Sequence, residues 1–310
     1  MELHYQLHEV APYINWLYFF NAWGFPPRYG NVAQLHDCPS CRAQWLASFA
    51  EEEKQKAREA MQLYDDALAL LRELEGKART HAIVGLYEAN GEGEDIVLHL
   101  DEELRIKREE LRINDVSDIR STIRLPMLRQ QHGETCLCWA DFLRPLSSGC
   151  RDIVGLFAAT ADESIVDDTD DYHHLLSQTL ADRLAEATAE RMHEEVRRRI
   201  WGYAKEERLT IEEMFQEKYI GRRPAVGYPS LPDQSLNFLI DKLLDMKRIG
   251  IQLTESGAMR PHASTSGLLF SHPQATHFAI GHIGDDQLLD YAHRRGLPEG
   301  DVRRFLAANL

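Results

Sequence analysis

The chain has 310 residues, of which 44% are hydrophobic and 27% are charged, a composition typical of a globular protein with a buried core. Its formal net charge of −15 argues against a nucleic-acid partner, because neutralising phosphates requires clustered Lys and Arg. The sequence has no apolar run long enough to cross a bilayer and no basic start followed by the apolar segment of a signal peptide. We therefore expect a cytoplasmic protein without a membrane partner.

The first 80 residues are predicted to be mainly helical. Short helical segments are expected over residues 13–45, and a longer helix over 47–76, where apolar residues recur at alternating steps of four and three. Glycine at position 76 is a plausible end to that helix. We expect residues 1–80 to form a helical N-terminal subdomain packed on an α+β domain of residues 81–310.

The strand signals begin after this helix. Residues 82–89 and 95–100 are rich in β-branched and aromatic side chains and flank a turn sequence at 90–93, a pattern that predicts a hairpin. Residues 153–160 form a second apolar run, and 277–283 alternate as a half-buried strand would. The predicted fold class is α+β, with an antiparallel or mixed twisted sheet and flanking helices, placed on one side of the sheet.

Three further helices are expected. The longest spans residues 172–205, and two shorter ones close the chain at 285–295 and 298–308.

The chain has five cysteines, which in the absence of an export signal indicates reduced thiols. Cys38 and Cys41, together with Cys136 and Cys138, could form a four-thiolate zinc site, with His36 or His132 as substitute ligands. The spacing does not match paired zinc knuckles, so separate thiols and no metal are the preferred interpretation.

A proline-flanked arginine is the clearest sign of a binding site. Residues 223–229 read RPAVGYP, so a permanent cation is held between a proline and a glycine turn. Stretches with serine, threonine or glycine follow at 253–256 and 264–267, where backbone amides could approach a ligand. A guanidinium can grip a carboxylate through two parallel hydrogen bonds, so we expect Arg223 to clamp an anion. The alternative is an ion pair with a carboxylate of the chain itself.

Four carboxylates are predicted to lie on one ridge of the long helix. Asp182, Glu186, Glu190 and Glu194 follow one another at four-residue steps. Like charges at this spacing repel, so the ridge requires nearby cations, either Arg183 and Arg191 or a ligand. Glu190 and Glu194 are interpreted as a solvated face.

These motifs resemble those of the S-adenosylmethionine (AdoMet)-binding reactivation domain of cobalamin-dependent methionine synthase. The resemblance extends over nearly the whole chain in order, through segments at residues 13–16 (YINW), 84–87 (VGLY), 128–131 (LRQQ), 140–142 (ADF), 170–172 (DDY), 180–187 (LADRLAEA), 201–203 (WGY), 223–228 (RPAVGY), 270–273 (FSHP) and 290–292 (DYA).

The resemblance implies roles for particular residues. In this family the arginine of the RPAxGY motif contacts the AdoMet carboxylate, and neighbouring residues of the motif contact the adenosyl part. The resemblance implies such contacts for Arg223, Pro224, Ala225, Gly227 and Tyr228. The glutamate of LADRLAEA lies near the AdoMet amino group and sulfonium, and the aspartate faces the cobalamin domain. Glu186 and Asp182 occupy these two positions.

Two positions depart from the family pattern. Asn15 replaces the usual acidic residue before the tryptophan, and Leu269 replaces a tyrosine before FSHP, next to Phe270 at the same expected site. An amide accepts a hydrogen bond but offers no charge to an ammonium group. We expect AdoMet to bind more weakly or in an altered orientation.

The implied activity is that of a methyltransferase component. With an electron from a flavodoxin-type donor, such a domain supports the reductive remethylation of cob(II)alamin on a partner corrinoid protein, with AdoMet as the methyl donor and no catalytic nucleophile of its own. The starting methionine and the end position favour a separately encoded subunit over a fragment. The alternative is a non-catalytic docking or capping module for a corrinoid protein or flavodoxin that has lost productive AdoMet use.

Overall fold

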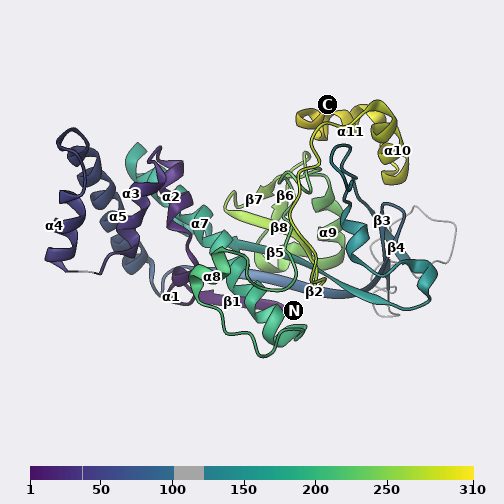
Figure 1. Ribbon diagram of the computed structural model, residues 1–310, viewed down its shortest axis with the longest axis horizontal. Helices are drawn as coiled ribbons and strands as arrows, with labels where there is room; N and C mark the ends of the chain where they lie inside the picture. Colours follow the sequence, from purple (N-terminus) through teal and green to yellow (C-terminus); the bar gives the residue numbers. More distant parts are fainter. Residues whose placement is uncertain (37, 101–121) are drawn as a thin grey trace.

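The computed structural model describes residues 1–36, 38–100 and 122–310 (Figure 1). Its centre is a six-stranded sheet in which strands β4, β3, β2, β5 and β8 are neighbours in that order and β1 also pairs with β2. All the ladders between these strands are antiparallel, which confirms the predicted fold class. The bounds are β1 (Glu2–Gln6), β2 (Arg79–Glu92), β3 (Asp95–His99), β4 (Thr122–Pro126), β5 (Asp152–Ala161) and β8 (Ser264–Leu269).

The long strand β2 organises this sheet. Its 14 residues pair with β5 along residues 80–89, which leaves the other edge to β1 at one end and to β3 at the other. The β2–β3 hairpin was predicted, although β2 continues to Glu92 and the turn is correspondingly later. The pairing of β1 was not predicted, and it places the first residues of the chain in the central sheet rather than among the helices.

Helices cover both faces of the sheet, so the prediction of helices on one side is wrong. Neighbouring residues of one strand belong to different cores: Phe157 packs in the core that contains α7 (Asp171–Glu195), whereas Leu156 packs in the core that contains α9 (Leu236–Leu244). Because successive side chains of a strand point to opposite faces, this alternation requires apolar cover on each side. It also explains why β5 reads as a continuous apolar run.

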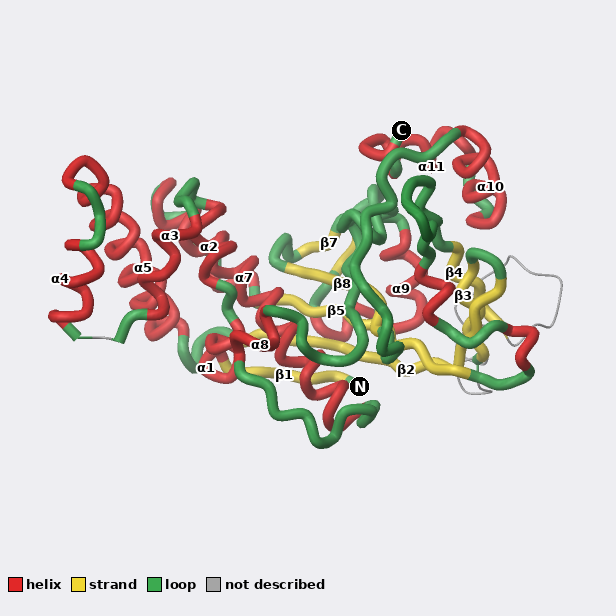
Figure 2. The backbone as a smooth tube through the Cα atoms, viewed as in Figure 1, coloured by secondary structure: helices red, strands yellow, loops and turns green. Residues whose placement is uncertain are grey.

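The N-terminal helices form one end of the elongated molecule (Figures 1 and 2). The predicted helix over 47–76 corresponds to α5, which begins only at Lys54; residues 48–53 separate it from α4, and Phe49 between the two helices is buried. α5 packs its apolar face into the same core as α7, whereas α4 has no fully buried residue. The bounds are α1 (Leu7–Val10), α2 (Trp16–Ala22), α3 (Pro27–Gly30), α4 (Pro39–Ala47) and α5 (Lys54–Leu74).

The predicted long helix is α7, which continues as one π-helical turn, Val196–Ile200, and ends before the expected residue 205. Small residues such as Ala181 and Ala185 are buried on it and allow close packing against the sheet. The remaining elements are α8 (Ile211–Phe215), the β6–β7 hairpin (Gln252–Leu253 and Met259–Arg260), α10 (Asp285–Arg295) and α11 (Glu299–Phe305). Among the described residues, no helix is long and apolar enough to span a membrane.

Residues 277–283 do not form the predicted strand. They run as an irregular segment that is anchored by Ile280 and Ile283, both buried beside Leu288 in a third core. The Ile280 amide donates to the Pro229 carbonyl oxygen at 2.9 Å, so the segment is tied to the loop that follows Arg223. The alternating pattern therefore reflects these anchor points rather than strand pairing.

Candidate ligand-binding site

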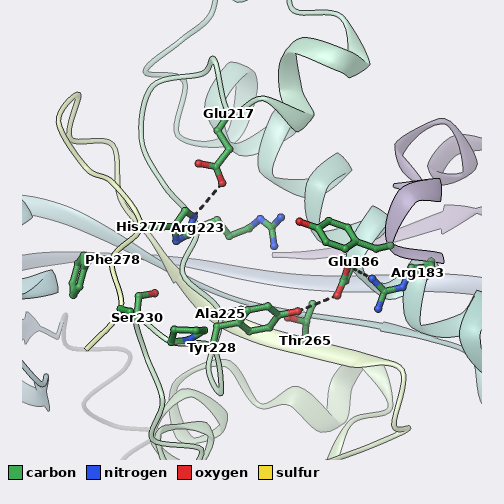
Figure 3. A pocket seen from close by; sticks show the side chains of 13 residues that line it. Arg183, Glu186, Glu217, Arg223, Ala225, Tyr228, Ser230, Thr265, His277 and Phe278 are labelled. Carbon is green, nitrogen blue, oxygen red and sulfur yellow. Dashed lines mark hydrogen bonds and ion pairs between the residues drawn. The ribbon is translucent and has the colours of Figure 1, made fainter. Parts of the chain in front are cut away.

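A cavity of about 700 Å³ opens between α7 and the segments that carry Arg223 and His277 (Figure 3). Its walls combine charged groups with apolar and hydroxyl side chains from distant parts of the chain. The lining residues are Tyr18, Arg183, Glu186, Glu217, Arg223, Ala225, Tyr228, Pro229, Ser230, Thr265, His277, Phe278 and Ala279.

The segment that carries Arg223 extends the sheet beyond β8. The Leu268 amide donates to the Pro224 carbonyl oxygen at 3.0 Å, and the Val226 amide donates to the Ser266 carbonyl oxygen at 2.9 Å. This close approach depends on Gly267, where a Cβ atom would lie 2.1 Å from the Pro224 carbonyl oxygen. The chain then turns at Gly227, whose φ of 89° is in the left-handed region. The backbone around Arg223 is thus fixed by main-chain contacts.

The two stretches expected to approach the ligand differ in their structure. Residues 264–267 belong to β8, and Gly267 accommodates the backbone of the Arg223 segment rather than leaving amides free for a ligand. Residues 253–256 belong to the β6–β7 hairpin, where the Thr254 and Ser256 hydroxyls bond to each other. Residues 264–267 are therefore a strand rather than the expected loop, although Thr265 lines the cavity, and residues 254–256 lie in the turn of the hairpin.

Arg223 forms a mostly buried ion pair and also lines the cavity. Its Nη2 donates to Oε2 of Glu190 at 2.9 Å, and the two side chains are 16% and 12% exposed. Burial alone would lower the pKa of Arg223, but Glu190, together with Tyr219 and Glu186, outweighs burial and the pKa is raised. Arg223 Nε and Glu190 Oε1 are buried without a hydrogen-bond partner. The pair leaves part of the guanidinium fork available to a second acceptor.

The carboxylate ridge is less solvated than expected. The assignment of Glu190 and Glu194 to a solvated face is wrong: Glu190 pairs with Arg223, and Glu194, 13% exposed, accepts hydrogen bonds from Tyr13 and Arg198. The expectation that the ridge has cationic partners is confirmed. These ion pairs reduce the repulsion between carboxylates that are one helical turn apart.

Glu186 lies at the cavity wall and connects two elements. Its Oε2 accepts from Arg183 Nη1 at 2.7 Å and its Oε1 accepts from the Tyr228 hydroxyl at 3.0 Å. Burial and the neighbouring Glu186 charge raise the pKa of Tyr228 to about 12, so this hydroxyl stays protonated and donates. Tyr228 is nevertheless 52% exposed, with its ring at the cavity mouth.

Sequence reasoning missed two charged or titratable residues of the cavity. Glu217 and His277 both line the cavity and pair directly with each other, with Glu217 Oε1 at 3.3 Å from His277 Nε2 (Figure 3). The hydrogen bond to His277 lowers the pKa of Glu217. Glu217 also has a φ of 53°, in the left-handed region that is unfavourable for residues other than glycine. Such strained backbone conformations are often found at functional sites. No local motif indicates this position, because its importance depends on the fold.

The other predicted site residues lie outside the cavity lining. Asn15 caps α2, where its Oδ1 accepts from the Leu17 amide at 3.2 Å. Leu269 and Phe270 are 1% and 0% exposed in the cores. Pro224 and Gly227 shape the backbone next to Arg223, and Asp182 lies one turn before Glu186, where its Oδ1 is 3.3 Å from His262 Nδ1. Direct ligand contacts by these residues remain predictions.

The four-thiolate zinc arrangement does not form. Cys138 is buried in the core beside Trp139, whereas Cys38 and Cys41 lie together near His36 at the start of α4. Within residues 1–36, 38–100 and 122–310, these three form the one group with metal-ligand spacing. The expectation of separate thiols is also wrong for Cys38 and Cys41.

The charge arrangement of the cavity fits a ligand that carries both signs. Arg223 offers a fixed cation, and the carboxylates Glu186 and Glu217 lie at other positions on the wall (Figure 3). Ala225, Pro229 and Phe278 add apolar surface. A zwitterionic amino-acid end with an attached planar apolar group would find a complementary group for each of its parts.

The chain is similar to a known protein family and to a solved structure. A sequence model of the family described as "Vitamin B12 dependent methionine synthase, activation domain" matches residues 6–296. Among solved structures, the chain is similar to the MetH reactivation domain bound to AdoHcy, with 36% sequence identity and a TM-score of 0.82. The match covers 100% of this chain and 90% of that one.

Proposed function

The chain belongs to the activation-domain family of vitamin B12-dependent methionine synthases, and we propose that its cavity binds S-adenosylmethionine. The observation that carries this proposal is the placement of Arg223 and Glu217 on the wall of one cavity. These opposite charges match the carboxylate and ammonium groups of the methionine end of AdoMet. The similar domain bound to AdoHcy, which differs from AdoMet by the transferred methyl group, supports the same ligand class.

The bound ligand would use three parts of the wall. Its carboxylate accepts from Arg223, on the part of the guanidinium not used by Glu190, while its ammonium group donates to Glu217. Its sulfonium lies nearer Glu186, whose charge favours a cation. The adenosyl part follows Ala225 and Phe278. In this arrangement Pro224 and Gly227 contribute by fixing the backbone, and Tyr228 contributes its ring at the mouth.

We further propose that the bound AdoMet serves as methyl donor to a corrinoid-carrying protein or domain. The cobalt of the partner's cobalamin supplies the methyl acceptor once a donor of the flavodoxin type has reduced it. The contribution of this chain is to hold the sulfonium methyl group in a fixed position and to exclude water around it. The reaction would take place in the cytoplasm.

The surface near the cavity supports docking of such a partner. Tyr18 and Tyr228 both line the cavity and are 57% and 52% exposed, and aromatic side chains are enriched at protein–protein interfaces. Asp182 lies one helical turn from Glu186 on the same side of α7 and would face the partner.

The second candidate is a docking or capping module that no longer uses AdoMet productively. The observation that favours it is the Arg223–Glu190 ion pair, which occupies part of the cation expected to bind the ligand. The use of the Asn15 side chain as a helix cap points in the same direction.

A methyl-transfer assay separates the two candidates. The chain is mixed with the cobalamin-binding domain of a vitamin B12-dependent methionine synthase in the cob(II)alamin form, with methyl-labelled AdoMet and an electrochemical reductant. The proposed function predicts labelled methylcobalamin with the native chain and with Arg42→Ala, a control whose arginine pairs with Asp65 on α5, but not with Arg223→Ala. A spectral change of the corrinoid without label transfer would support the docking module and contradict the methyl-transfer role.

A further inference from the structure

A pair of cysteines lies at the N-terminus of α4, away from the cavity. The Sγ atoms of Cys38 and Cys41 are 2.6 Å apart, and the donor atoms of these two residues and His36 all lie within 4.8 Å of one another. α4 lies at the end of the molecule formed by the N-terminal helices (Figure 1). Both thiols are partly exposed and neither belongs to a disulfide.

We propose that Cys38 and Cys41 form a redox-active dithiol that exchanges with low-molecular-weight disulfides and closes to an intramolecular disulfide. Residues three apart in the first turn of a helix are close enough for a disulfide without rearrangement of the helix. A shared zinc ion fits less well, because two thiolates at about 2.3 Å from one tetrahedral zinc would be roughly 3.8 Å apart. A structural zinc site would also need a fourth ligand, and the group found among the described residues has three.

The local structure gives the two thiols different roles. Cys38 is the N-cap of α4, where its sulfur accepts from the Cys41 amide at 3.3 Å and lies 3.3 Å from the Ser40 hydroxyl. Its hydrogen bond with Cys41, followed by those with Ser40 and the Cys41 amide, lowers the pKa of Cys38 to about 6. The hydrogen bond with Cys38 in turn raises the pKa of Cys41. Cys38 is therefore the attacking thiolate and Cys41 the resolving thiol.

The exchange balances in two steps. The Cys38 thiolate attacks one sulfur of a small disulfide, forms a mixed disulfide and releases one small thiolate. Cys41 then loses its proton to His36 or water, and its thiolate attacks Cys38 Sγ and releases the second small thiolate, which takes up a proton. Two thiols of the protein become one disulfide, and the small disulfide takes up the two electrons.

The surroundings allow this reaction without disturbing the fold. α4 has no fully buried residue, and its attachment to α5 includes the bidentate Arg42–Asp65 pair, with both bonds at 2.7 Å. The cavity lining includes no residue of α4. The success or failure of the redox proposal is therefore independent of AdoMet binding.

The test is a redox titration of the full chain. Reduced protein is equilibrated anaerobically with glutathione buffers of increasing disulfide content, alkylated and mapped by mass spectrometry. We expect a Cys38–Cys41 disulfide, and in Cys41→Ser a stable mixed disulfide of Cys38 with one glutathione. Cys38→Ser should form neither product. Cys150→Ser, which removes an exposed thiol at another site, should behave as the native chain does.

Alkylation rates provide a second measurement that does not depend on disulfide formation. At pH 6.5, Cys38 should react roughly five-fold faster in the native chain than in the urea-unfolded chain, because its larger thiolate fraction outweighs the lower reactivity of a less basic thiolate. The proposal is overturned if no disulfide forms in any glutathione buffer. It is also overturned if one zinc ion co-purifies with the chain and protects both thiols until it is chelated.

Discussion

Replacing Arg223 with alanine should lower both ligand affinity and stability, for two separable reasons. Arg223 and Glu190 are 16% and 12% exposed and joined at 2.9 Å, so truncating the arginine leaves a buried carboxylate without its cation. Removing one partner of a buried pair costs about 3 kcal/mol. At an unfolding entropy of about 2 cal/mol/K per residue, this cost lowers the melting temperature of a chain of this size by roughly 5 °C.

A double-mutant cycle separates the two effects. Arg223→Ala with Glu190→Gln should regain most of the lost stability, because the uncompensated charge is removed together with its partner. It should not regain ligand affinity, which should remain roughly 100-fold below that of the native chain, since the loss of a charged hydrogen bond costs about 3 kcal/mol. Thermal unfolding and calorimetric titration with AdoHcy measure the two quantities. Native-like binding by the double variant would refute the carboxylate role of Arg223, and an unchanged melting temperature for Arg223→Ala would refute the buried pair.

Three further perturbations test other parts of the account. Gly267→Ala should lower AdoMet affinity at least tenfold in calorimetry, because its Cβ atom would displace the Pro224 carbonyl 2.1 Å away; unchanged affinity would contradict this. Glu217→Gln should weaken AdoMet binding about tenfold at neutral pH, where the lowered pKa of Glu217 keeps its carboxylate ionised. Calorimetric titration with AdoMet measures this loss, and unchanged affinity would contradict the ammonium role of Glu217. Burial lowers the pKa of His193 well below its usual value, so the unfolded state binds an extra proton as the pH falls below about 6.5. Below that pH, the free energy of unfolding measured by urea titration should fall by about 1.4 kcal/mol for each unit by which the pH decreases. The decrease per pH unit should be smaller in His193→Phe.

The parts of the fold that depend on local signals could be predicted from the sequence. The β2–β3 hairpin, the apolar strand β5 and the helix α10 were placed correctly, because side-chain period and turn residues are sufficient to identify them. The pairing of β1 could not be predicted in this way. Its partner lies nearly 80 residues later, and nothing in a five-residue strand indicates which edge it will join.

The candidate site could be predicted in part. The motif around Arg223 and the glutamate at position 186 can be read from the sequence, and the structure brings both to one cavity. Glu217 and His277 could not be identified, since they meet only when an irregular segment folds back against the loop after α8. The solvated interpretation of Glu190 was wrong because helix periodicity shows which residues share a ridge, but not which cation lies opposite.

The most direct test of the central claim removes the carboxylate from the ligand rather than the arginine from the protein. Calorimetric titrations would compare AdoMet with its decarboxylated analogue on the native chain and on Arg223→Ala. If Arg223 binds the AdoMet carboxylate, the native chain should prefer AdoMet by roughly 100-fold, and Arg223→Ala should bind both ligands equally weakly. If the native chain binds both ligands equally, or if the variant retains the preference, the proposed site is contradicted.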